Sequence, residues 1–88
     1  MKVIDFKNVI RKDVPIYYRR LYSGIVILEL VKKQGEYRID FSIEQKPTGL
    51  KDISITFLDA VDYPLIPLNK EIKSYIDTLD SNGGLPNT

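Results

Sequence analysis

The 88-residue sequence contains no cysteine and no histidine. The lack of cysteine excludes disulfides, a thiolate nucleophile and a cysteine-ligated metal site. The lack of histidine removes the commonest general acid–base group and the commonest zinc ligand. We therefore expect no metal, no cofactor and no catalytic residue, and we predict that the chain is not an enzyme.

Long apolar runs are also missing from the sequence. No run approaches the roughly 18–20 residues that a membrane-spanning helix needs. Lys2, Asp5 and Lys7 interrupt the segment where a signal peptide would have its apolar core. The sequence thus predicts a cytoplasmic protein with no membrane partner.

The composition is that of a small globular domain. Hydrophobic residues make up 43% of the chain and charged residues 28%, which is enough apolar material for one core. No internal repeat and no long linker divides the sequence. We expect a single α+β domain over residues 1–80, followed by a helix C-cap and a flexible tail over residues 81–88.

Residues 25–43 carry the strongest pattern in the chain. Apolar residues fill positions 25–31 except at Glu29, as expected of a strand that is central or covered on both sides. Residues 37–43 alternate between apolar and polar side chains, which is typical of a strand with one buried face. The polar segment 32–36 contains Gly35, so we predict a β-hairpin that turns there.

Two further strands flank this hairpin in the sequence. In residues 3–10 we expect Ile4, Phe6 and Ile10 to share one face. Pro47 and Gly49 predict a reversal over residues 45–51. Beyond it, residues 52–58 again alternate, with the odd-numbered apolar side chains facing inward.

Residues 16–22 fit either of two structures. As a helix they have Pro15 in the first turn and Gly24 just past the end. As a strand they contain three tyrosines and continue directly into Ile25. The aromatic content favours the strand.

The last element is helical. We expect residues 59–67 to form a loop because Pro64 and Pro67 disfavour both helix and sheet ladder. Asn69 is a suitable N-cap, and Gly83 a suitable C-cap. Between them runs an apolar stripe at helical spacing, formed by Ile72, Tyr75, Ile76 and Leu79. The fold class is therefore α+β: a small, mostly antiparallel sheet of four to five strands, with one C-terminal helix packed on one face.

An open sheet with a single covering helix leaves two edges, and unpaired edge groups recruit a partner strand. Pro15 is placed to block one edge, whereas only terminal charges guard residues 52–58. We predict a non-catalytic protein-interaction module that self-associates through an open sheet edge.

The alternative is a domain that binds single-stranded nucleic acid. Residues 1–33 carry eight basic and three acidic side chains, for a charge of +5, while residues 34–88 carry five basic and nine acidic side chains, for −4. Segment 11–22 interleaves basic and aromatic residues that suit phosphates and unpaired bases. The candidate nucleic-acid-binding residues are Arg11, Lys12, Tyr17, Arg19, Arg20 and Tyr22.

Overall fold

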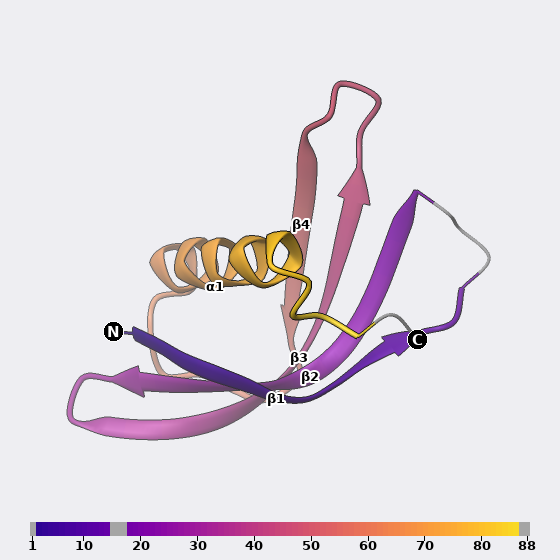
Figure 1. Ribbon diagram of the computed structural model, residues 1–88. Helices are drawn as coiled ribbons and strands as arrows, with labels where there is room; N and C mark the ends of the chain where they lie inside the picture. The colour runs from indigo at the N-terminus through magenta and orange to yellow at the C-terminus, as the bar shows by residue number, and fades with distance from the viewer. Residues whose placement is uncertain (1, 15–17, 87–88) are drawn as a thin grey trace.

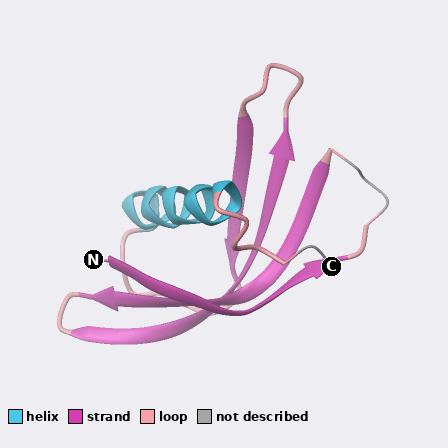
Figure 2. Ribbon diagram, in the orientation of Figure 1, coloured by secondary structure: helices cyan, strands magenta, loops and turns pink. Residues whose placement is uncertain are grey.

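The computed structural model of the protein describes residues 2–14 and 18–86. Its elements follow the chain as four strands and one helix: β1 (Lys2–Lys12), β2 (Arg19–Leu30), β3 (Lys33–Gln45), β4 (Lys51–Phe57) and α1 (Leu65–Ser81). The sheet order is β1-β2-β3-β4, and each strand is antiparallel to its neighbour. The helix crosses one face of this twisted meander (Figures 1 and 2). The predicted α+β fold class is confirmed.

The hairpin of β2 and β3 is the longest pairing in the sheet, and it runs from Arg19 opposite Glu44 to Leu30 opposite Lys33. Its turn is Val31–Lys32, with Lys32 in the left-handed region at φ 66°. The predicted turn over residues 32–36 was therefore wrong, because Gly35 lies inside β3. A side chain at position 35 would meet the Tyr37 ring, since a Cβ there would lie 2.8 Å from the Tyr37 hydroxyl. Gly35 serves this close approach and not the turn.

The ambiguous segment 16–22 is resolved in favour of a strand from Arg19 onward. Residues 19–22 are the first part of β2, which continues without a break into the apolar run. The expected fifth strand is thus merged with the next one. Pro15 and Tyr17 lie outside the described residues.

The face predicted for β1 was wrong. Ile4 and Ile10 are exposed, by 36% and 59%, whereas Val3 is buried. Two register shifts, between Val3 and Asp5 and between Lys7 and Ile10, interrupt the pairing of β1 with β2. Each such bulge changes which residues face the core, so simple alternation cannot be read through it.

The start of the helix also differs from the prediction. α1 begins at Leu65 after Pro64, so Pro67 lies inside its first turn and Asn69 is not the N-cap. The first N–H groups of a helix have no intrahelical acceptor, and a proline there costs no hydrogen bond. The predicted stripe is confirmed, because Ile72 and Ile76 are buried and Leu68 extends the row by one turn.

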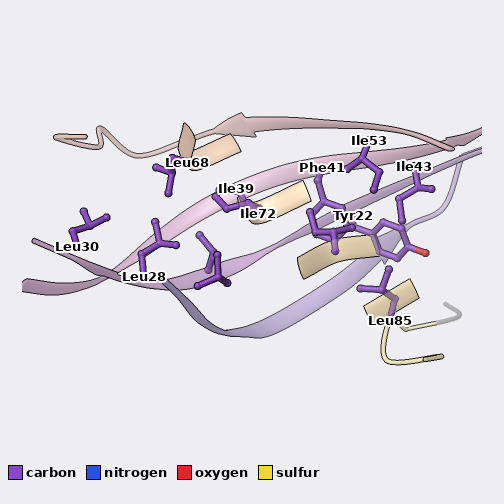
Figure 3. Packing of buried hydrophobic residues seen from close by; sticks show 13 residues of the cluster. Tyr22, Leu28, Leu30, Ile39, Phe41, Ile43, Ile53, Leu68, Ile72 and Leu85 are labelled. Carbon is purple, nitrogen blue, oxygen red and sulfur yellow. The ribbon is translucent and has the colours of Figure 1, made fainter. Parts of the chain in front are cut away.

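The core lies between α1 and the facing side of the sheet (Figure 3). Four aromatic rings form its centre: Tyr22 stacks on Phe41 at 5.0 Å, and Phe6 stacks on Tyr75 at 5.3 Å and meets Phe41 edge-on. The buried apolar residues are Val3, Tyr22, Val26, Leu28, Leu30, Ile39, Phe41, Ile43, Ile53, Leu68, Ile72, Ile76 and Leu85.

The chain after α1 adds to this core. Gly83 adopts φ 71°, and the Gly84 N–H donates to the Leu79 carbonyl, which closes the helix with a glycine as expected. Leu85 is then 8% exposed within the core cluster. The expected tail at residues 81–88 therefore includes one residue that covers the sheet.

Candidate functional site

β4 forms one edge of the sheet, and its outward backbone groups can be assigned from the ladder. The Leu58 N–H donates to the Arg38 carbonyl, and the Lys46 N–H donates to the Leu50 carbonyl. These bonds place the even-numbered residues of this region in hydrogen-bonded pairs with β3, since such pairs alternate along an antiparallel ladder. The backbone N–H and C=O groups that point away from the sheet belong to Lys51, Ile53, Ile55 and Phe57.

Nothing in the strand itself hinders the addition of another strand. The pairing of β4 with β3 runs from Phe57 to Lys51 without a register shift. Its sequence contains no proline and a single lysine. Proline, bulges and projecting lysines are the usual obstacles at sheet edges, and β4 has neither of the first two.

The lysine of β4 is directed toward the helix. The Lys51 Nζ lies 3.0 Å from Asp77 and 2.9 Å from Asp80 of α1. These bonds raise the pKa of Lys51, with the hydrogen bond to Asp80 as the largest cause. Lys51 is thereby held against α1 instead of projecting from the edge.

Asp80 is the centre of this ionic group. Its carboxylate also accepts two hydrogen bonds from the Arg20 guanidinium, at 2.8 and 3.0 Å. Arg20, aided by Lys51, lowers the pKa of Asp80 to about 2, although partial burial acts in the opposite direction. The two cations offset the unfavourable position of an acid at a helix C-terminus, and they tie α1 to β2 and β4.

A groove lies between β4 and α1 beside the free edge. Its volume is about 550 Å³. Residues at the start of β4 and on α1 line it, including Leu50, Ile53, Lys73 and Ser74. An added strand would place alternate side chains on the helix face of the sheet, and the groove leaves room for them there.

Two exposed leucines flank β4. Leu50 is 67% exposed and Leu58 is 51% exposed. Both follow the parity of the outer face, where Asp52, Ser54 and Thr56 are polar and exposed. The sequence carried this signal, because two leucines end an otherwise polar alternate row, but the prediction did not use it.

The structure separates the basic residues of segment 11–22. Arg20 lies on the helix face and pairs with Asp80, whereas Lys12 pairs with Asp40 on the other face at 3.3 Å. Arg19 is exposed opposite Glu44, and Arg11 lies opposite Tyr22.

The aromatic partners of this segment are not available for base stacking either. Tyr22 is 1% exposed and stacks on Phe41, so it cannot receive a base. Tyr17 lies outside the described residues. The single basic and aromatic surface that the nucleic-acid alternative requires is thus not formed by the described candidates, and that alternative stays a prediction.

Among residues 2–14 and 18–86, no group of three acidic side chains lies close enough together to hold a metal ion. In the same part of the chain, the single helix does not have the length and apolar character required to cross a membrane.

Comparison with known proteins identifies a family and no closer relative. The model of the BB-0187 family matches residues 1–81, and the chain therefore belongs to this family. The search of curated proteins found no match, and neither did the search of solved structures.

Proposed function

We propose that this member of the family is a non-catalytic protein-interaction module that accepts a partner strand along β4. The observation that supports this function is the regular, unguarded edge of β4, with the outward backbone groups of four residues, Lys51, Ile53, Ile55 and Phe57. Main-chain hydrogen bonds along such an edge supply affinity, and pockets for alternate side chains supply selectivity. A cytoplasmic location stays a prediction from the sequence.

The groove between β4 and α1 supports the same function. Strand addition is selective only where side chains of the new strand find a surface to contact. The groove offers the apolar side chain of Ile53 together with the polar side chains of Lys73 and Asp77. A partner strand with an apolar residue facing this groove and polar residues on the outer face suits it best.

A labelled peptide with the sequence of residues 50–58 tests the function directly. We expect it to bind the intact chain and to lose binding when Ile55 is replaced by proline. The Ile55 N–H points outward, so Ile55→Pro removes a donor from the edge without breaking a bond to β3. Ile55→Ala is the matched control, because it removes the same side chain and keeps the N–H.

Fluorescence anisotropy with the three proteins measures the result. Binding to the unmodified chain and to Ile55→Ala, with binding to Ile55→Pro reduced at least tenfold, supports strand addition at β4. Equal binding to all three proteins, or no binding to any of them, overturns the proposal. Circular dichroism verifies that Ile55→Pro keeps the fold.

A further inference from the structure

We infer that the strand that pairs with β4 is the β4 strand of a second copy, antiparallel and centred on Ser54. This inference rests on the function proposed above and specifies its partner. A two-fold axis through Ser54 would join two four-stranded sheets into one continuous sheet, with both helices on the same face.

Backbone parity limits the registers that two β4 strands can adopt. The outward N–H and C=O groups belong to odd-numbered residues, so odd residues must lie opposite odd residues across the new ladder. A shift by one residue would oppose odd and even residues and turn the core face of one copy outward. The two-fold axis must therefore pass through a residue, and not between two residues.

The ends of the strand select Ser54 as that residue. With the axis at Ser54, Lys51 lies opposite the partner's Phe57, and Ile53 lies opposite the partner's Ile55, so all four outward-facing residues are paired. A two-fold axis at Ile53 or Ile55 leaves one end of β4 unpaired.

The same register brings the two exposed leucines together. Leu50 lies opposite the partner's Leu58 at each end of the ladder, and these side chains are 67% and 51% exposed in the single chain. Burial of apolar surface favours association. With the axis at Ile55, Leu58 would instead lie opposite the partner's Asp52.

Charge also permits this arrangement. Asp52 lies opposite the partner's Thr56, and the Lys51 amine is paired with Asp77 and Asp80 of its own helix. No like charges of the two β4 strands are directly opposed, an arrangement that would be destabilising. On the helix face, the groove beside Lys51 leaves room for the partner's Phe57.

A single introduced cysteine tests the register, because the chain contains no other cysteine. With the axis at Ser54, the two copies of this residue form a non-hydrogen-bonded pair with Cα atoms about 4.5 Å apart, which is within the range of a disulfide of about 4.4–6.8 Å. We expect Ser54→Cys to form a disulfide-linked dimer in air. Thr56→Cys is the matched control on the same face, and its two copies would be about 13 Å apart.

The outcomes separate this inference from the proposed function. Crosslinking of Ser54→Cys without crosslinking of Thr56→Cys, and a doubled mass of the unmodified chain in sedimentation at high micromolar concentration, support the Ser54 register. Equal crosslinking of both variants overturns the register. A monomeric mass together with binding of the 50–58 peptide overturns self-pairing and leaves strand addition standing. A monomeric mass without peptide binding overturns both.

A charge exchange provides an independent measurement. Ser54→Lys and Ser54→Asp should each be monomeric at concentrations at which the unmodified chain is a dimer, because each opposes two like charges at the axis. An equimolar mixture of the two variants should recover the dimer mass. Failure of the mixture to associate, or undiminished association of either variant alone, contradicts the Ser54 register.

Discussion

β1 and β4 occupy equivalent positions at the two sides of the sheet, but only β1 is distorted against further pairing. Its two register shifts and the left-handed Asn8, at φ 53°, break the regular row of backbone groups. β4 pairs regularly along its whole length. Charge does not explain the difference, since the lysines of both edges are engaged: Lys7 pairs with Glu36, and Lys51 with Asp77 and Asp80. In this protein the backbone itself distinguishes the closed edge from the open one.

Both edges depend on α1, which contacts β1 and β4. Ile76 is fully buried under the sheet, and Ile76→Ala should lower the free energy of unfolding by roughly 2–5 kcal/mol, because the substitution leaves a cavity. Chemical denaturation measures the loss. Ile66→Ala is the matched control on the same helix, since Ile66 is 86% exposed. Equal effects of the two substitutions would show that α1 does not cover the sheet as described.

The ionic group at Asp80 ties α1 to the β4 side, and acid should release it. The pKa of Asp80 is about 2 in the folded protein, against an ordinary value of 3.8. A depressed pKa stabilises the fold above the unfolded value, and the contribution is lost as pH falls through the folded value. We expect the free energy of unfolding to decrease by about 2 kcal/mol between about pH 4 and pH 2.

Denaturation of Asp80→Asn over the same pH range isolates this contribution. The variant should be less stable at neutral pH and should show a smaller decrease on acidification. Some decrease should persist, because Arg38 lowers the pKa of Asp59, and the Ser23 hydroxyl and Lys12 lower that of Asp40. Asp77→Asn is the control, since its side chain is 57% exposed. An unchanged pH dependence in Asp80→Asn would contradict the assignment.

The smallest expected effect concerns the closed edge. Asn8 tolerates a positive φ better than a β-branched residue does. Asn8→Val should therefore cost about 1–2 kcal/mol of unfolding free energy, while Asn8→Gly should be close to neutral. Thermal denaturation of the two variants provides the comparison. A neutral Asn8→Val would mean that β1 can pair regularly, and the contrast between the two edges would then be lost.

The sequence predicted the fold wherever regular spacing determines structure. Alternation in residues 37–43 and 52–57, and helical spacing from Ile72 to Leu79, correctly identified the faces that meet in the core. The errors arose where local geometry breaks the period. The bulges of β1 moved Ile4 and Ile10 outward, Gly35 served the Tyr37 ring instead of a turn, and Pro67 was compatible with a first helical turn.

The candidate site was predicted only in part. An open edge at residues 52–58 follows from the order of the strands, and the sequence indicated it. The groove beside that edge depends on where α1 crosses the sheet, and the position of Lys51 depends on Asp77 and Asp80 being brought to it. These pairings join residues far apart in the chain, and no local pattern announces them.

The position of α1 after all four strands has a consequence for synthesis on the ribosome. Each strand pairs with its neighbour in sequence, so the meander can form as the chain emerges, whereas Ile72, Ile76 and Leu85 arrive last. At about 5–20 residues per second, the segment from Leu58 to Leu85 takes roughly one and a half to six seconds to be translated. During that interval the apolar side of the sheet faces water, and the nascent chain is more prone to aggregate than the finished protein.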